Sequence, residues 1–258
     1  MNTVIHTHSL APGLTEVVLC RPERRNALSI DLLEGLSNTL DKLAAEKSER
    51  VIILRGEGPV FSAGLDLREA AQDALVERSA AGVERLLRTL RTSPLVSIAA
   101  VQGSAFAGGA GVMVACDIVV AADTVEIGFP EARRGLLPAL IARVLGTKVR
   151  DGDLRDLFLV GEPISAQRAQ QWGLIQRIVP PDQVLTEARR IAEAVLAGGP
   201  ETIRITKQLI NDLYHRESAS GHALEELHLT ARRSAEAREG LAAFAEKRNP
   251  KWMETKSS

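Results

Sequence analysis

The sequence is poor in cysteine, in aromatic residues and in net charge, and each shortage excludes a class of protein. Two cysteines in 258 residues cannot form a disulfide scaffold, and the apolar neighbours of Cys20 and Cys116 predict buried thiols in a reducing compartment. Aromatic residues make up 3% of the chain, and 32 Lys and Arg against 33 Asp and Glu leave a net charge of −1. We therefore expect no nucleic-acid partner, since such surfaces combine a basic excess with stacking aromatics.

Targeting and membrane segments are also lacking. Residues 1–10 have neither the basic stretch nor the apolar stretch of a signal peptide. The uncharged run Thr92–Cys116 is as long as a membrane span, but Pro94 and several glycines favour a strand, a glycine turn and a buried helix. We therefore expect no membrane partner and a cytoplasmic location.

Strand and helix patterns alternate along most of the chain, which predicts an α/β fold whose strands are covered on both faces. Ser29 is the expected N-cap of the first helix. The predicted strands are Thr15–Cys20, Val51–Leu54, Leu95–Val101 and Ile118–Ala122, and the predicted helices are Leu28–Leu43 and Ala71–Leu90.

A boundary is expected at Ala197–Pro200, where the sequence reads Ala-Gly-Gly-Pro. Residues 200–258 look helical beyond it, and they either pack on their own core or reach a neighbouring subunit. The predicted organisation is thus a core of residues 1–199 and a helical region of residues 200–258.

Several familiar sites fail on inspection. The glycines around Gly109 lack the third glycine of a dinucleotide fingerprint, and no Lys-Ser/Thr pair completes a phosphate loop. There is no Gly-x-Ser-x-Gly elbow, and the five histidines form no metal-ligand motif and are expected at the surface. We therefore expect no metal.

Two glycine-containing turns remain, Phe61–Asp66 and Gly103–Gly111, and each directly follows a predicted buried strand. Strand ends of this kind are where ligands bind in open α/β folds, and glycine lets main-chain N–H groups approach a ligand closely. One N–H group from each turn could hold a developing oxyanion. The alternative is that these glycines only permit close packing of a helix on a strand.

Glu131 is the candidate acid/base residue. It follows Phe129 and Pro130 and precedes Leu136 and Leu137. Apolar neighbours would raise the pKa of its carboxyl group by desolvation, which suits proton transfer near neutral pH. The alternative is an ordinary solvated loop glutamate.

Together these motifs resemble the crotonase, or enoyl-CoA hydratase/isomerase, superfamily. The resemblance implies a spiral of ββα units with a helical C-terminal trimerisation region, and a homotrimer or a dimer of trimers. It implies an acyl-CoA thioester substrate, with coenzyme A as part of the substrate and no separate cofactor. It runs in order through Arg21–Leu28, Phe61–Leu67, Ala100–Gly103 with Gly108–Gly109, Cys116–Asp117, Phe129–Glu131 with Gly135 and Pro138, Gly161–Ala166 with Trp172–Leu174, and Glu239–Arg248.

The resemblance also implies roles for individual residues. Leu65 and Gly108 match the positions whose N–H groups hold the thioester oxygen, and Glu131 matches a catalytic glutamate. The implied substrate-binding residues are Arg24, Arg25, Ala63, Gly64, Asp66, Leu67, Gly109, Gly111, Pro130, Pro138, Phe244 and Lys247.

The chain departs from the hydratases of this family at Gly111, where they carry a second glutamate. One remaining carboxylate favours isomerisation of an enoyl-CoA double bond, because that reaction needs a single base. The alternatives are hydration by a variant mechanism with one glutamate, and a family member that binds acyl-CoA without catalysis. The segment Ala139–Gly146 is shorter than in typical hydratases, so no acyl-chain length is implied.

Overall fold

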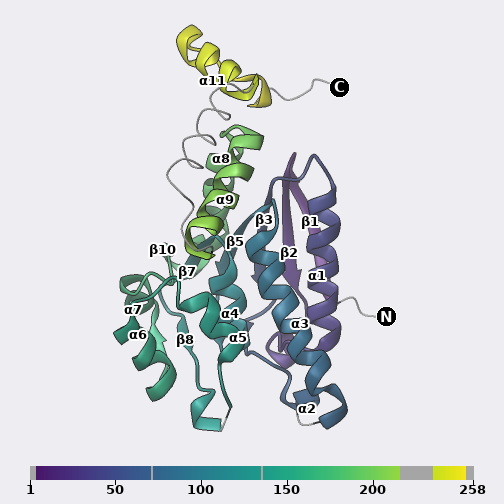
Figure 1. Cartoon of the computed structure of the whole chain (residues 1–258), viewed down its shortest axis with the longest axis vertical. Helices are drawn as coiled ribbons and strands as arrows, with labels where there is room; N and C mark the ends of the chain where they lie inside the picture. The colour runs from purple at the N-terminus through teal and green to yellow at the C-terminus, as the bar shows by residue number, and fades with distance from the viewer. Residues whose placement is uncertain (1–3, 71, 135, 216–234, 254–258) are drawn as a thin grey trace. The chain divides into compact units, whose positions relative to one another are not determined.

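The computed structural model describes residues 4–70, 72–134, 136–215 and 235–253 (Figure 1). The chain divides into two compact units, Met1–Arg190 and Ile191–Ser258. No helix among the described residues is long and apolar enough to cross a membrane.

The larger sheet of the first unit has six strands in the order β1-β2-β3-β5-β7-β10. β1 pairs with β2 antiparallel, and all the other pairs are parallel. The four predicted strands are confirmed. β1 was not predicted, because this edge strand is mostly exposed and carries alternating histidines rather than an apolar run. The strands are β1 Ile5–Ala11, β2 Leu14–Leu19, β3 Val51–Gly56, β5 Val96–Val101, β7 Ile118–Ala122 and β10 Arg177–Val179.

The smaller sheet has the order β4-β6-β8-β9, with only the β8–β9 pair antiparallel. Three of its strands come shortly after a strand of the larger sheet, so the chain repeats a strand, a short strand and a helix. This arrangement confirms the predicted α/β fold of ββα units. The strands are too short to give a period in the sequence: β4 Val60–Ser62, β6 Ser104–Phe106, β8 Glu126–Gly128 and β9 Ile164–Ser165.

Helices cover the sheets, and the two long ones, α1 and α3, pack side by side (Figure 1). The Ser29 side chain accepts a hydrogen bond from the Leu32 N–H at 3.3 Å and caps α1 as predicted. The helices of this unit are α1 Ile30–Ala45, α2 Leu67–Ala70, α3 Asp73–Thr92, α4 Gly108–Ala115, α5 Ala139–Leu145, α6 Asp151–Arg155, the π-helix Asp156–Val160, α7 Ala166–Gln171, and the 3-10 turns Pro22–Arg24, Ala132–Arg134 and Pro181–Gln183.

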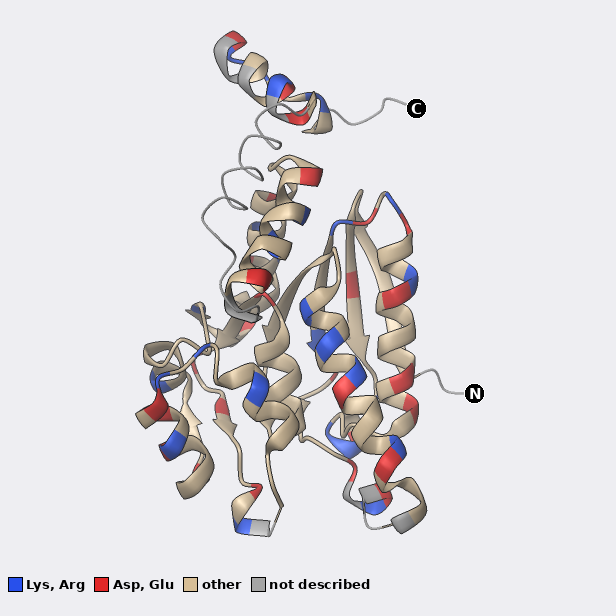
Figure 2. Ribbon diagram, viewed as in Figure 1, with Lys and Arg blue, Asp and Glu red and all other residues tan. Residues whose placement is uncertain are grey.

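The charge pattern separates the outer helices from α4. Figure 2 shows basic and acidic residues interspersed along α1 and α3. α4 carries no charged residue, and all eight of its residues are buried. It is therefore the central helix of the unit, and its position against β4 and β6 sets the shape of the site.

Cys116 is buried as predicted, but Cys20 is only half-buried because it lies just beyond the end of β2. The second helix begins at Asp73 rather than Ala71, and residues 71 and 135 lie outside the described part of the chain. His6 and His8 are exposed on β1 as predicted, whereas the placement of His222 and His228 is not described.

Helix α8 (Val184–Leu196) runs from the first unit into the second, in which α9 (Pro200–His215) and α11 (Ala235–Glu246) follow. The predicted boundary at Ala197–Pro200 thus falls between two helices. The expected helical character holds for residues 200–215 and 235–246 and for the 3-10 turn at 251–253, while residues 216–234 and 254–258 lie outside the described residues. Trp252, on the 3-10 turn Lys251–Met253, donates from Nε1 to the carbonyl of Ala197 at 3.0 Å.

Candidate active site

A cavity of about 630 Å³ opens in the first unit. Six segments line it: the loop before α1, the turn after β4, α2, one face of α3, the start of α4, and the stretch from the end of β8 into α5. The residues at its surface are Arg24, Arg25, Ala27, Ala63, Leu65, Asp66, Arg68, Val76, Ser79, Ala80, Val83, Ala107, Gly108, Glu131, Leu136, Leu137, Pro138, Leu140 and Ile141.

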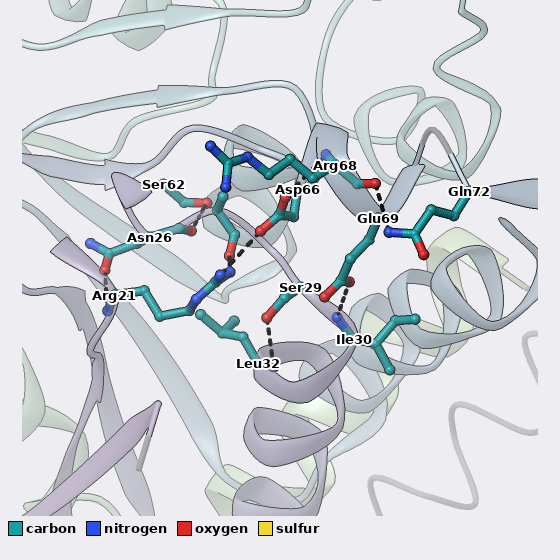
Figure 3. Close-up of polar contacts among 11 residues, drawn as sticks. Arg21, Asn26, Ser29, Ile30, Leu32, Ser62, Asp66, Arg68, Glu69 and Gln72 are labelled. Atoms are coloured by element: carbon teal, nitrogen blue, oxygen red, sulfur yellow. Dashed lines mark hydrogen bonds and ion pairs between the residues drawn. The ribbon is translucent and has the colours of Figure 1, made fainter. Parts of the chain in front are cut away.

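A buried amide holds the loop before α1 in place (Figure 3). Asn26 is fully buried, and its Oδ1 accepts from the Arg21 N–H at 2.9 Å. Its Nδ2 donates to the carbonyls of Glu57 at 2.9 Å and Val60 at 2.8 Å. This one side chain therefore ties the loop to the segment that joins β3 to β4.

The same loop fixes the turn after β4 through the main chain. The Leu28 N–H donates to the Gly64 carbonyl at 2.8 Å, and the Asp66 N–H donates to the Leu28 carbonyl at 3.2 Å. These two bonds form an isolated parallel bridge between Leu28 and Leu65. Such a bridge leaves the N–H of Leu65 unused, and Leu65 lies at the cavity.

Glycines bring the turn after β4 against the start of α4. Gly64 has a φ of +89°, and a Cβ there would lie 2.8 Å from the Cβ of Ala107. A Cβ on Gly109 would lie 2.5 Å from the carbonyl oxygen of Ser62. Gly64 and Gly109 therefore do permit close packing of the turn on α4. Their neighbours Leu65 and Gly108 lie at the cavity.

The start of α4 offers a second unused donor. Ala107, its N-cap, has a φ of 51°, a strained backbone conformation for a residue with a side chain. Gly108 follows as the first residue of the helix, where N–H groups have no partner within the helix. Within the described part of the chain, neither the Leu65 N–H nor the Gly108 N–H donates to a protein acceptor. Two such donors at one cavity can hold an oxygen that gains negative charge.

Asp66, at the same cavity, is engaged in an ion pair (Figure 3). Its Oδ2 lies 3.1 Å from Nη2 of Arg21, and its Oδ1 accepts from the Arg68 N–H at 3.1 Å. Burial raises the pKa of the Asp66 carboxyl, but the hydrogen bonds from Arg21 and Arg68 outweigh this and hold it below its usual value. Asp66 is therefore a poor proton acceptor near neutral pH.

Glu131 is the other carboxylate at the cavity. It follows the fully buried Phe129 beyond β8, is 8% exposed, and its carbonyl accepts from the Leu136 N–H at 2.9 Å, which closes the loop. Leu136 and Leu137 lie at the same cavity and are 50% and 83% exposed. That they enclose the Glu131 carboxylate stays a prediction.

Another part of the cavity surface is apolar. Val76 on α3 and Leu136, Leu137 and Leu140 before and within α5 are exposed although they are large and hydrophobic. Deeper in the cavity, Val83 and Ile141 are buried. Exposed apolar side chains gathered at a cavity are typical of a ligand-binding site.

The structure thus places many of the predicted site residues at one cavity: Leu65, Gly108, Glu131, Arg24, Arg25, Ala63, Asp66 and Pro138. Gly64, Gly109 and Gly111 are buried behind its surface, Pro130 is half-buried beside Glu131, and Leu67 begins α2.

Two predicted residues, Phe244 and Lys247, belong to the second unit. Lys247 is exposed just after α11, and Phe244 lies on α11 with a side chain outside the described residues.

The α3 face of the cavity was not predicted, although the spacing of Val76, Ala80 and Val83 is that of one helix face. No group of three potential ligand side chains is placed to hold a metal among the described residues.

The two sheets of ββα units, with a cavity between two strand-end turns, define a protein of the crotonase superfamily. The sequence profile of the enoyl-CoA hydratase/isomerase family matches residues 10–255. The chain belongs to this family, whose members act on acyl-CoA thioesters, and it is an enzyme of the enoyl-CoA isomerase or hydratase type.

Individual relatives agree with this assignment. A mevalonyl-coenzyme A hydratase of Aspergillus fumigatus is 33% identical over 258 residues, covering 95% of this chain and 93% of the relative. An enoyl-CoA isomerase/hydratase of Mycosarcoma maydis is 32% identical over 255 residues, covering 92% of each chain. The crystal structure of an enoyl-CoA hydratase from Bacillus anthracis superposes with a TM-score of 0.91 at 30% identity, covering 96% of this chain and 98% of that one.

Proposed function

We propose that the enzyme moves the double bond of an enoyl-CoA thioester, converting a 3-enoyl ester to a 2-enoyl ester, with Glu131 as the single acid/base. The observation that carries this proposal is the cavity itself. Of the two carboxylates among its described residues, Asp66 has a pKa held below its usual value by Arg21 and Arg68, so we assign the proton transfer to Glu131, which is 8% exposed at the cavity.

The reaction balances with one carboxylate and no cofactor. Glu131 removes a proton from C2, and the electron pair moves toward the thioester oxygen to give a dienolate. The protonated Glu131 then delivers a proton to C4, the double bond forms between C2 and C3, and the carboxylate is restored. No water enters the product.

The N–H groups of Leu65 and Gly108 stabilise the dienolate oxygen. Both lie at the cavity, and neither has a protein acceptor among the described residues. Because the turns that carry them are already fixed by Asn26 and by the close approach at Gly109, the donors do not have to reorganise during the reaction. Loss of one such donor lowers a rate by about 10²–10³.

The basic residues at the cavity bind the coenzyme A portion. Arg24, Arg25 and Arg68 lie there, and a guanidinium group suits phosphate oxygens. Phe244 and Lys247 of the second unit contribute to the nucleotide end, and the C-terminal helices mediate a homotrimer or a dimer of trimers. Size-exclusion chromatography with light scattering tests the assembly.

Hydration of a 2-enoyl ester is the second candidate. The observation that favours it is the relative in Aspergillus fumigatus, which is named a hydratase. In that reaction Glu131 would act alone on a water held by main-chain groups. The two candidates differ in the mass of the product, because hydration adds a water and isomerisation does not.

Replacing Glu131 by Gln tests the proposal. The amide keeps the shape of the side chain but cannot accept a proton, so kcat should fall by about 10³ while the affinity for a saturated acyl-CoA stays within about threefold. Glu126→Gln is the matched control, because Glu126 is exposed on β8 close to Glu131 in the chain. Equal activity of wild type and Glu131→Gln would remove Glu131 from the mechanism. An absence of both turnover and C2 proton exchange in wild type would favour an acyl-CoA binder.

A further inference from the structure

Gly111 and Ile141 share one volume beside the cavity. Gly111 lies in the first turn of α4, and a Cβ built on it would be 3.1 Å from Cγ1, 3.4 Å from Cγ2 and 3.6 Å from Cδ1 of Ile141. Three carbons of one isoleucine therefore lie over the place where a side chain at position 111 would begin.

The Ile141 side chain is held where it is. Its helix, α5, begins at Ala139, and the first turn is closed by a hydrogen bond from the Ala142 N–H to the Pro138 carbonyl at 2.8 Å. Val144 and Leu145 anchor the same helix with exposures of 2% and 0%. Ile141 is itself 5% exposed and still lies at the cavity surface. It is a fixed part of the cavity wall.

The wall formed by α4 and Ile141 offers no polar side chain. No residue of α4 carries a polar side chain, since its sequence is Gly-Gly-Ala-Gly-Val-Met-Val-Ala. The isoleucine that covers Gly111 offers only methyl and methylene groups. A water that takes part in a reaction needs two to four polar partners, and an activated water also needs a base. Gly111 and Ile141 supply neither a polar side chain nor a base.

We propose that Ile141 is the specificity-determining residue that restricts this enzyme to proton transfer within the acyl chain. It fills the volume beside the first turn of α4 and so excludes both a reacting water and a second acid/base side chain at position 111. This inference rests on the proposed isomerase function, in which Glu131 alone moves the proton.

The pairing makes a specific prediction about substitutions. A glutamate at position 111 would meet Ile141 first, because its Cβ would lie 3.1 Å from Cγ1 of Ile141, so Ile141 or α5 would have to shift. Gly111→Glu alone should displace α5 and lower the melting temperature and the isomerisation rate, the latter by about tenfold or more. Ile141→Ala removes the three obstructing carbons, so the double variant should recover most of both losses.

The experiment compares wild type, Gly111→Glu, Ile141→Ala and the double variant in a double-mutant cycle, with melting temperature and reaction products as readouts. Gly111→Glu with Val144→Ala is the matched control, because Val144 is buried on the same helix but does not lie at the cavity. The substrates are a 3-enoyl-CoA and a 2-enoyl-CoA of equal chain length. In the double variant, water addition to the 2-enoyl ester should rise at least about tenfold above wild type.

Each outcome decides the inference. Recovery in the Ile141 double variant, none in the Val144 control, and a gain of hydration would support it. Additive losses, equal rescue by Val144→Ala, or recovered stability with no gain of hydration would overturn it while leaving the proposed isomerase function intact. Water addition by the wild type would overturn both the proposed function and the exclusion of water by Ile141.

Discussion

The two sides of the cavity are built by different means. One side, formed by the loop before α1, the turn after β4 and the start of α4, is fixed by main-chain hydrogen bonds, the Asn26 amide and close contacts at glycines. The other side, formed by α3 and by the stretch from Leu136 into α5, is apolar and partly exposed. We call them the bonded wall and the apolar wall.

The two walls are suited to two different tasks, stabilising charge and binding the acyl group. The bonded wall holds two N–H groups in fixed positions, which a charge-stabilising site requires. The apolar wall has no such geometric demand, because burial of hydrocarbon is non-directional and scales with area. We therefore expect substitutions in the bonded wall to damage the chemical step, and substitutions in the apolar wall to change which acyl groups are accepted.

Among substitutions in the two walls, the largest effect is expected at Gly109. Replacement by Ala puts a Cβ 2.5 Å from the Ser62 carbonyl oxygen and 2.6 Å from the Ser62 Cβ, so α4 must move away from the turn after β4. We expect kcat/KM to fall by about 10². Gly152→Ala in α6 is the matched control, because nothing lies within 4 Å of its added Cβ, and it should raise stability by about 0.5–1 kcal/mol. Similar losses of activity in the two variants would contradict the claim that the bonded wall positions the N–H groups for the chemical step.

The second effect is expected at Asn26. Its replacement by Ala leaves the carbonyls of Glu57 and Val60 and the N–H of Arg21 without their partner. We expect the free energy of unfolding in urea to drop by about 2–4 kcal/mol. The exposed Asn38, which accepts from Arg85, gives the control, and its replacement by Ala should change stability by less than about 0.5 kcal/mol. A loss confined to the control would contradict the role given to Asn26.

A smaller effect with a pH signature is expected at Asp66. Its pKa in the folded protein is below that of the unfolded chain, so its ion pair with Arg21 stabilises the fold above a pH of about 4 and stops doing so as the pH falls through the folded pKa. Asp66→Asn should therefore be less stable than wild type by about 1–2 kcal/mol at neutral pH, and the gap should close in acid. Thermal unfolding from pH 7 to pH 2 measures this, with Glu34→Gln, in an exposed pair with Arg78, as the variant expected to show little change. A gap that stays constant with pH would contradict the assignment.

The smallest effect on stability is expected in the apolar wall. Leu137 is 83% exposed, so Leu137→Ser should change the free energy of unfolding by less than about 0.5 kcal/mol. It should still raise KM about fivefold for long-chain acyl esters and much less for short ones, because we expect only long chains to bury apolar surface against Leu137. Leu159→Ser is the control, since Leu159 is 72% exposed and is not a cavity residue. An equal change in KM for short and long chains would show that Leu137 does not contact the acyl tail.

The sequence predicted the bonded wall better than the apolar wall, for a physical reason. Gly64 lies in the turn after β4 and Gly109 in the first turn of α4, shortly after β6, and glycines at such strand ends are visible in the local sequence. The exposure of Leu136 and Leu137 depends on the path of the loop, which the local sequence does not show. The contact of Ile141 with Gly111 joins two helices that are distant in the chain, so no local pattern shows it.

The same reasoning accounts for the elements. The buried strands and the long amphipathic helices were predictable because they carry a period or an apolar run. The short strands β4, β6 and β8 have three residues each, which is too few to establish a period. β1 was missed because its pairing with β2, rather than its own composition, makes it a strand.

The most direct test of the central claim is an assay of the wild-type enzyme in D₂O with a 3-enoyl-CoA and, separately, the matching 2-enoyl-CoA, read by mass spectrometry. If Glu131 alone transfers protons along the acyl chain, the 3-enoyl ester becomes the 2-enoyl ester without gaining water, and deuterium appears at C2 or C4. Glu131→Gln should abolish both the conversion and the exchange. Rapid addition of water to the 2-enoyl ester, with no interconversion of the two esters, would contradict the account.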